Sequence, residues 1–223
     1  MSIGNDIISL NAINPHRTKQ VRFYSKIVSR SELKLYSAQE FSGMSFENFV
    51  WLLWSVKESV YKFQKRIFQD LKFSPAKIEV EKVTFPKKKS VPKFKILECK
   101  QDSFLKEEFH TGSVRFGNHT FYFKSIMNEE LISTIVSKDE KFENTWWGFK
   151  SIDCNNYENQ SKEVRTFVLN ELKTFFPKNR LHIRKHKIGY PVLVKEGRDT
   201  KIPVSFTHHD RFVCYSCLIK EVL

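Results

Sequence analysis

The chain has 223 residues, 40% of them hydrophobic and 28% charged, so it is long enough to bury a core and too apolar to be disordered. Its formal net charge of +13 favours an anionic partner: nucleic acid, a membrane surface, a nucleotide cofactor or an acidic protein. No stretch approaches the roughly 18 apolar residues of a membrane-spanning helix, and no secretory signal opens the sequence, so we expect a cytoplasmic protein with reduced cysteines.

The first part of the chain is expected to form a strand, then helices, then further strands. Residues 2–10 are rich in β-branched side chains, which is typical of a buried strand. Apolar residues at helical spacing predict a helix over 29–41 and a stronger one over 45–72, beginning at Ser45. The hydrophobic period then changes to two, which predicts strands over 77–83, 93–97, 119–126 and 131–136.

A polar, Asn-rich segment at 138–160 predicts a boundary between two domains, 1–137 and 138–223. Beyond it we expect a helix over 161–176, then strands near 181–183, 188–194, 202–206 and 211–220, the last of these with a helix as an alternative ending.

A weak internal repeat relates these two parts. Lys57-Glu58 and Lys162-Glu163 each begin an apolar-periodic stretch that leads into strands. The repeat predicts an α+β fold of two similar halves forming a pseudodimer, each a helix packed on a small antiparallel sheet, with a site at their interface. Chance similarity between two helix-and-strand units is the alternative.

Asp6 and Glu58 are the first candidate site residues. Asp6 interrupts an apolar strand, and a carboxylate buried there must be paired, hydrogen-bonded or bound to a metal. Glu58 has Lys62 one helical turn later; alone, that pair indicates no more than an ordinary surface ion pair. Two carboxylates from different elements, with lysines nearby, suit Mg²⁺ and a phosphate-bearing substrate.

The segment from Ser205 to Asp210 is the other candidate. A histidine with adjacent hydroxyls in a turn is able to bind phosphate, and an ordinary surface turn with incidental histidines is the alternative. Cys214 and Cys217 lack the second ligand pair of a zinc site and, three apart in a strand, face opposite sides, so we expect core cysteines.

Several short patterns follow one another along the chain. They are Gly4-x-Asp6-Ile7, Arg22-Phe23 with Glu32, Trp54-x-x-Lys57-Glu58-x-x-x-Lys62, Gly189-x-Pro191 and Ser205-x-Thr207-His208. Together they resemble the signatures of the 4′-phosphopantetheinyl transferase superfamily. Each pattern alone is weak, whereas all of them in this order are fairly specific. They cover residues 4–62 and 162–217 and leave the middle matched only in general pattern.

The resemblance implies Mg²⁺-dependent transfer of the 4′-phosphopantetheine arm of coenzyme A to a serine of an apo carrier protein, with release of 3′,5′-ADP. It implies that Asp6 and Glu58 hold the metal, and that Glu58 helps to deprotonate the acceptor serine. It also implies that Lys62 stabilises the transferred phosphoryl group and that Lys57 assists.

By the same resemblance, Ser205, Thr207, His208 and Lys62 would contact coenzyme A. The partner would be an acidic carrier of fatty-acid, polyketide or peptide-synthase type. The enzyme would be a monomeric pseudodimer that engages neither membrane nor nucleic acid.

The sequence departs from the family pattern at three positions and in the order of its halves. Ile8 stands where longer, surfactin-type members have a second acidic ligand, Tyr190 replaces the Lys of a Gly-Lys-Pro signature, and Thr207 replaces a Ser. The metal-binding half comes first, as in short holo-acyl-carrier-protein synthases, so the chain is either a pseudodimer with exchanged halves or a short synthase with an insertion. A basic nucleic-acid-binding protein and a non-catalytic carrier-binding module remain alternatives.

Overall fold

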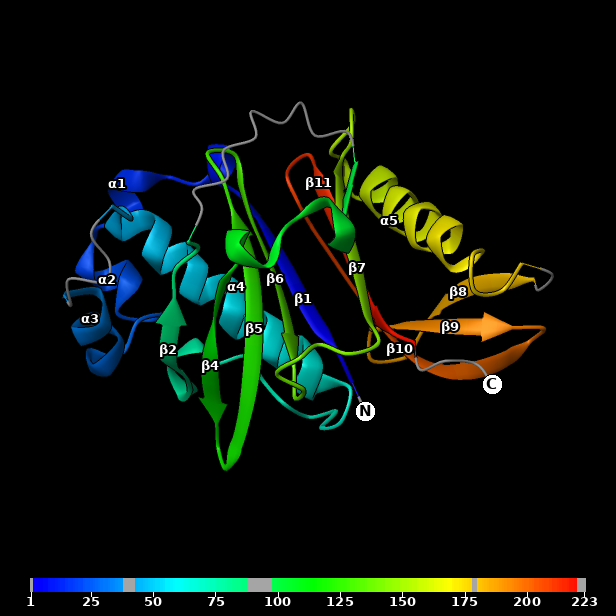
Figure 1. The fold of residues 1–223 in the computed structure, drawn as a ribbon, viewed down its shortest axis with the longest axis horizontal. Helices are drawn as coiled ribbons and strands as arrows, with labels where there is room; N and C mark the ends of the chain where they lie inside the picture. The colour runs from blue at the N-terminus through cyan, green and yellow to red at the C-terminus, as the bar shows by residue number, and fades with distance from the viewer. Residues whose placement is uncertain (1, 38–42, 88–97, 178–179, 220–223) are drawn as a thin grey trace.

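The computed structural model describes residues 2–37, 43–87, 98–177 and 180–219, which form two antiparallel sheets, each covered by a long helix (Figure 1). The helices are α1 (Pro15–Thr18), α2 (Val21–Tyr24), α3 (Arg30–Ser37), α4 (Phe46–Lys65) and α5 (Tyr157–Leu172), and short 3₁₀ turns span Leu10–Ala12, Pro75–Lys77, Gln101–Ser103 and Lys106–Glu108. None of the helices in these ranges has the length and apolar character needed to cross a membrane.

The first sheet has the strand order β1-β6-β5-β4-β2. Its strands are β1 (Gly4–Ser9), β2 (Ile78–Thr84), β4 (His110–Phe116), β5 (His119–Met127) and β6 (Leu131–Ser137). The second sheet has the order β3-β7-β11-β10-β9-β8. Its strands are β3 (Glu98–Lys100), β7 (Thr145–Ser151), β8 (Leu181–Lys185), β9 (Pro191–Lys195), β10 (Arg198–His209) and β11 (Phe212–Leu218).

Helix α4 begins at a capping residue and packs on the first sheet through one face. The Ser45 side chain accepts a hydrogen bond from the Asn48 amide at 3.2 Å, which satisfies one of the free N–H groups of the first turn. The apolar residues of the helix then lie on one face and pack on the first sheet, among them Phe49, Leu52 and Val56, all fully buried. This packing fixes which face of α4 turns toward β1.

Helix α5 covers the second sheet in the same way. Asn156 caps it by accepting a hydrogen bond from the Asn159 amide at 2.8 Å. Val164, Phe167 and Val168 form the buried side of the helix and share a hydrophobic cluster with residues of β10 and β11. The α+β class predicted from sequence is therefore confirmed, whereas the pseudodimer relation between the halves stays a prediction.

Strand β1 joins the two halves, because it pairs with β6 in its own sheet and also packs against β10 and β11 of the other (Figure 1). Ile8 contributes to the core under α4, while Ile7 points the opposite way into a cluster that includes Phe149 and Cys214. Gly4 lies on the α4 side, where an added Cβ would stand 1.9 Å from the Ser59 carbonyl oxygen. The absence of a side chain at Gly4 thus lets α4 approach β1 closely.

The segment 138–160, in which the sequence places a domain boundary, contains β7, which pairs with β11 in the second sheet. The division into domains 1–137 and 138–223 stays a prediction. Strand β3, from the predicted first domain, pairs with β7 as well. The strand predicted over 93–97 lies outside the described residues. Cys214 and Cys217 are buried in different clusters, as expected, and burial raises the pKa of the Cys214 thiol to about 11.

Candidate functional site

Asp6 lies where β1, α4 and β10 meet. Its side chain is buried, and its Oδ1 atom accepts hydrogen bonds from the Lys62 ammonium and from the Thr207 hydroxyl, each at 3.0 Å. Burial raises the pKa of Asp6 to about 6; Lys62 opposes that shift and Glu58 adds to it. Because burial disfavours the ionised form of Asp6, additional positive charge nearby would stabilise it.

Lys62 connects the two candidate carboxylates. Its Nζ atom lies 3.0 Å from Asp6 Oδ1 and 3.4 Å from Glu58 Oε1. Burial by itself would lower the pKa of Lys62, but the charges of Asp6 and Glu58 outweigh burial and raise it. Lys62 therefore stays protonated at neutral pH, and Glu58, on the same face of α4 one turn earlier, remains partly open to solvent.

The Asp6–Glu58 pair is the candidate site for a hard cation. The second oxygen of Asp6, Oδ2, is buried and lacks a hydrogen-bond partner among the described residues. Such an atom is unfavourable unless a ligand reaches it. Across the described ranges, no group of three or more His, Cys, Asp or Glu side chains gathers as a metal cage would require. Two carboxylates with the rest of the shell open suit Mg²⁺, which keeps waters and substrate phosphates as ligands.

The segment Ser205–His208 is not the turn predicted from sequence. It lies inside β10, whose pairing with β11 runs from Val204 to His209. Because side chains alternate along a strand, Thr207 points to Asp6 while Phe206 and His208 line a cavity on the other side. Ser205 is buried and lies on the same face of β10 as Thr207. The sequence grouped these residues as one phosphate-binding turn. In the structure Thr207 lies beside Asp6, whereas His208 lies at the cavity.

The turn between β10 and β11 is fastened to the end of β1. The Ser9 amide donates to His209 Nδ1 at 2.8 Å, and the Ser9 hydroxyl donates to Asp210 Oδ2 at 3.0 Å. Asn155 donates to the other Asp210 oxygen, also at 3.0 Å. These bonds fasten the end of β10 to the end of β1 and so help to hold Thr207 beside Asp6.

A cavity of about 170 Å³ opens beside His208, between α5, β8 and β10. Cationic side chains dominate its polar lining: Arg165 from α5, and Arg184 and Lys185 from the end of β8. Burial lowers the pKa of His208, and the nearby charge of Lys62 lowers it further. The cavity therefore offers fixed positive charge together with a neutral imidazole close to the Asp6 cluster.

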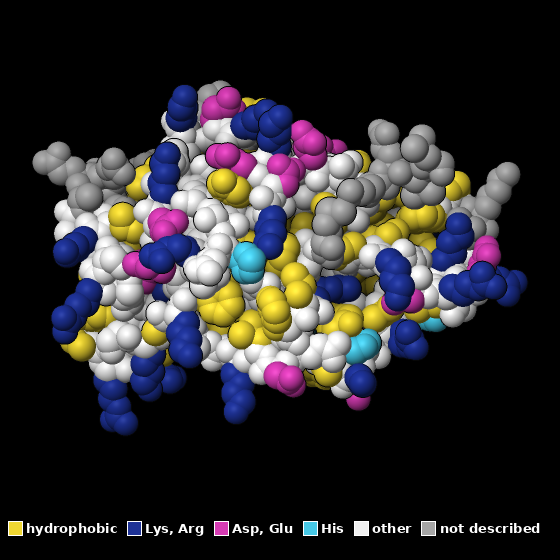
Figure 2. All heavy atoms as spheres, turned by 90° about the horizontal axis from the view of Figure 1, so that it is seen from below, with side chains coloured by type: hydrophobic (Ala, Val, Ile, Leu, Met, Phe, Trp, Pro, Cys, Tyr) yellow, Lys and Arg dark blue, Asp and Glu magenta, His cyan; other side chains and the backbone are white. Residues whose placement is uncertain are grey.

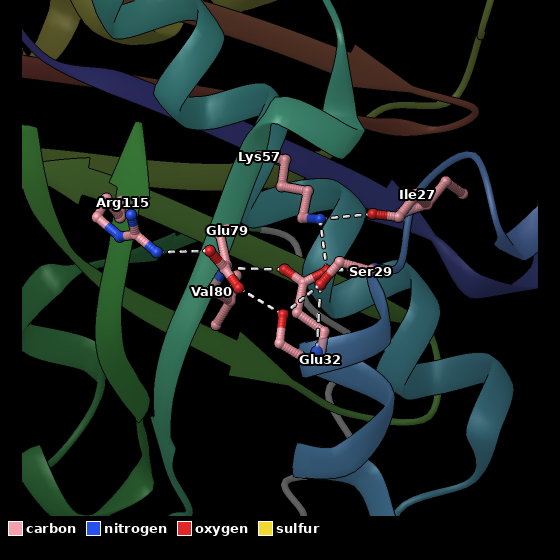
Figure 3. Close-up of polar contacts among 8 residues, drawn as sticks. Ile27, Ser29, Glu32, Lys57, Glu79, Val80 and Arg115 are labelled. Carbon is pink, nitrogen blue, oxygen red and sulfur yellow. Dashed lines mark hydrogen bonds and ion pairs between the residues drawn. The ribbon is translucent and has the colours of Figure 1, made fainter. Parts of the chain in front are cut away.

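Lys57 is not brought into this cluster. It is fully buried, and its ammonium donates to the Ile27 carbonyl and, at 2.7 Å, to Glu32 Oε2 (Figure 3). Glu32 also accepts the amide protons of Ser29 at 2.7 Å and of Val80 at 2.8 Å. Burial lowers the pKa of Lys57, and the negative charge of Glu32 opposes this shift. The catalytic assistance predicted for Lys57 therefore has no support in its position, which ties α4 to α3 and β2.

Sequence reasoning missed the cationic lining of the cavity. Arg165 follows the buried Val164 on α5, and Arg184 and Lys185 end a strand in which polar and apolar residues alternate. The alternation at 181–185 is a usable signal for one polar face, whereas nothing in the local sequence says that α5 and β8 converge on His208. The second-half counterpart of Glu58, Glu163, pairs with Lys150 at 2.6 Å and lies apart from the Asp6 cluster.

Comparison with known proteins agrees with this arrangement. A sequence model described as the 4′-phosphopantetheinyl transferase superfamily matches residues 2–114, half of the chain. The match includes β1, α4 and thus Asp6, Glu58 and Lys62. Neither a curated protein nor a solved structure gave a match. The chain therefore belongs to the 4′-phosphopantetheinyl transferase superfamily.

Proposed function

We propose that this chain is a holo-acyl-carrier-protein synthase type of enzyme, which transfers 4′-phosphopantetheine from coenzyme A to a serine of an acidic apo carrier protein with Mg²⁺ and releases 3′,5′-ADP. Membership of the family supports phosphopantetheine transfer, with coenzyme A as substrate and a carrier protein as acceptor. We further propose that it acts as a monomer in the cytoplasm. The observation that carries the proposal is the Asp6–Lys62–Glu58 cluster at the junction of the two halves.

Each member of the cluster has a role that its surroundings support. Asp6 and Glu58 would hold Mg²⁺, which when bound neutralises charge on the pyrophosphate of coenzyme A. Lys62, protonated and close to both carboxylates, is placed to neutralise charge that develops on the transferred phosphoryl group. Glu58 is the more exposed carboxylate and is the one an acceptor hydroxyl from another protein is able to reach.

The proposed reaction is one displacement at phosphorus. The acceptor serine oxygen bonds to the phosphorus that carries the pantetheine arm, and the bond from that phosphorus to the departing 3′,5′-ADP oxygen breaks. Glu58 takes the serine proton, and charge passes to the leaving phosphate. The chain's own contribution is position and charge, because the reactive bond belongs to coenzyme A.

The cavity beside His208 is proposed to receive the nucleotide end of coenzyme A. Arg165, Arg184 and Lys185 supply the positive charge that a 3′-phosphate requires, and His208 lies between them and Lys62. In this arrangement Thr207 orients Asp6, and His208 and Phe206 of the Ser205–His208 segment face the ligand, which differs from the contacts implied for Ser205 and Thr207 by the family pattern.

Glu58→Gln tests the assignment directly. Purified wild-type protein with Mg²⁺ and coenzyme A should add about 340 Da to an apo carrier protein, measured by mass spectrometry. Glu58→Gln should slow that addition at least about 100-fold, because the variant loses both a metal ligand and the proton acceptor. A panel of apo carriers of fatty-acid, polyketide and peptide-synthase type would identify the acceptor.

Glu163→Gln is the matched control for this experiment. Glu163 follows Lys162 on α5 as Glu58 follows Lys57 on α4, and its carboxylate contacts Lys150 rather than the Asp6 cluster. This variant should keep close to wild-type activity. A Glu58→Gln enzyme that is as active as Glu163→Gln would disprove the site assignment.

A nucleic-acid-binding role is the second candidate, supported by the net charge of +13. Figure 2 shows Lys and Arg side chains spread along one whole face of the molecule rather than gathered into one stripe, which does not favour it. Salt-sensitive binding of DNA or RNA that coenzyme A leaves unchanged would support that role. A non-catalytic carrier-binding module would instead bind apo carrier without any mass addition.

A further inference from the structure

Arg66 joins the face of α4 that carries Glu58 and Lys62 to the turn His186–Tyr190, which borders the cavity. It follows α4 directly and lies one helical turn beyond Lys62, so Glu58, Lys62 and Arg66 follow one another along one face. Its Nη1 atom donates to the carbonyl oxygens of Val204, in β10, and of Pro191, in β9, the latter at 3.3 Å. One side chain of the first half thus contacts two strands of the second.

Arg66 also stacks on an aromatic pair in that turn. Its guanidinium carbon lies 4.6 Å from the centre of the Tyr190 ring, and Tyr190 stacks on His186 with ring centres 4.3 Å apart and planes 6° apart. The turn is closed by hydrogen bonds between His186 and Tyr190 and between Gly189 and His186, each 2.8 Å, with Gly189 at a φ of +104°. The turn is therefore a defined unit held from one side by Arg66.

The same turn forms a wall of the cavity. Lys185, Gly189 and Pro191 line it, whereas Arg66 and Tyr190 are not among the lining residues. Arg66 is therefore placed to act on a ligand only through the position of this wall. Coenzyme A would need the cavity and the Asp6 cluster at a fixed separation, because one molecule has to occupy both.

We infer that Arg66, stacked on Tyr190, is a positioning residue that sets the nucleotide cavity at the correct distance from Lys62 and so determines affinity for coenzyme A. The inference rests on the proposed function. It also gives a role to Tyr190, which stands where the family pattern has a lysine: its ring receives the guanidinium of Arg66.

The test is calorimetric binding of coenzyme A and of 3′,5′-ADP, together with steady-state kinetics. Arg66→Met should weaken the binding of both ligands at least about tenfold and raise KM for coenzyme A by a similar factor, while kcat changes less than about threefold, because the reacting groups themselves remain. Arg66→Lys, which keeps the charge but loses the planar fork, should fall between Met and wild type.

Two further variants make the result decisive. Arg115→Met removes one positive charge from an exposed ion pair with Glu79 and Glu81. Arg115 lies on β4, which β6 and β5 separate from β1 in the first sheet, so this variant should bind coenzyme A as wild type does. Tyr190→Leu removes the stacked ring at a half-buried position and should reproduce the weaker binding even if Arg66→Met does not fold.

Failure of the inference is distinguishable from failure of the proposed function. Wild-type affinity in folded Arg66→Met or Tyr190→Leu, or a loss confined to kcat, would overturn the role of Arg66 while leaving the transferase intact. A wild-type protein that binds neither coenzyme A nor 3′,5′-ADP would overturn the proposed function and this inference with it.

Discussion

Lys57→Met should lower the free energy of unfolding by about 3–5 kcal/mol, measured by urea denaturation at neutral pH. Lys57 and Glu32 both have side chains with 0% exposure, and their charged atoms lie 2.7 Å apart. Methionine fills much of the same volume but leaves the Glu32 carboxylate buried without a counter-charge. The penalty is the desolvation of that unpaired charge, because among the described residues the amide protons of Ser29 and Val80 are the donors that remain to Glu32.

Two comparisons separate the buried pair from ordinary charge loss. The double variant Glu32→Gln with Lys57→Met removes both charges and should lose less stability than the two single changes added together. Lys19→Met breaks an ion pair with Glu47 in which the lysine side chain is 61% exposed, and it should change stability by less than about 1 kcal/mol. A Lys57→Met protein that loses no more than Lys19→Met would show that the buried charge pair does not stabilise this fold.

The strand and helix that carry the site could be predicted because their signals are local. An acidic residue inside the apolar run at 2–10 has to be buried with a partner, and Asp6 proves to be buried against Lys62 and Thr207. Ser45 caps α4 as predicted. The helix nevertheless ends at Lys65 rather than near residue 72, since Arg66 turns to the second half and the next apolar residues, Ile67 and Phe68, are left exposed.

Two neighbouring residues show where local reasoning ends. Lys57 and Glu58 are adjacent in one helix, and the sequence groups both with the reaction centre. A helix turns by about 100° from one residue to the next, so Lys57 points to Glu32 and Ile27 while Glu58 stays beside Lys62. Which of the two faces β1 depends on how α4 packs, and that packing is set by residues far away in the sequence.

The second half of the chain was harder to predict from sequence, because its strands are defined by pairing with distant segments rather than by local signals. Polar residues around 138–160 conceal β7, although Thr145, Trp147 and Phe149 alternate toward one buried face. The residues Ser205–His208 resemble a turn because they combine hydroxyls and histidines. In the structure β10 continues through them because it pairs with β11, which pairs in turn with β7. Tertiary pairing overrides a local turn signal at this point.

Asp6→Asn should lower phosphopantetheine transfer at least about 100-fold and, at the same time, stabilise the fold above about pH 6. The loss of activity follows from the loss of a charge that would hold Mg²⁺ and that pairs with Lys62. The gain in stability follows from the pKa of Asp6, which burial raises to about 6 in the folded state from 3.8. Transfer is measured by mass addition to the carrier, and stability by urea denaturation.

The sign of the pH effect follows from proton binding. Between pH 3.8 and about 6 the folded protein keeps the Asp6 proton that the unfolded chain has released, so the folded state loses stability as pH rises through this window. A difference of about two pKa units corresponds to a loss of stability of about 3 kcal/mol. This loss is complete above the pKa of Asp6 in the folded protein and absent below its pKa in the unfolded chain. The stability advantage of Asp6→Asn over wild type should therefore be larger at about pH 7.5 than at about pH 3.5 by this amount.

Magnesium should cancel most of the stability difference between the two proteins at about pH 7.5. An ion bound to Asp6 and Glu58 stabilises only the folded state, so MgCl₂ at about 100 times its Kd should raise wild-type stability by about 2.7 kcal/mol and leave Asp6→Asn nearly unchanged. Asp70→Asn, at an exposed aspartate, should follow wild type in both pH and magnesium series. Equal pH profiles for wild type and Asp6→Asn would mean that Asp6 carries no buried charge, and an equal response to magnesium would place the cation elsewhere.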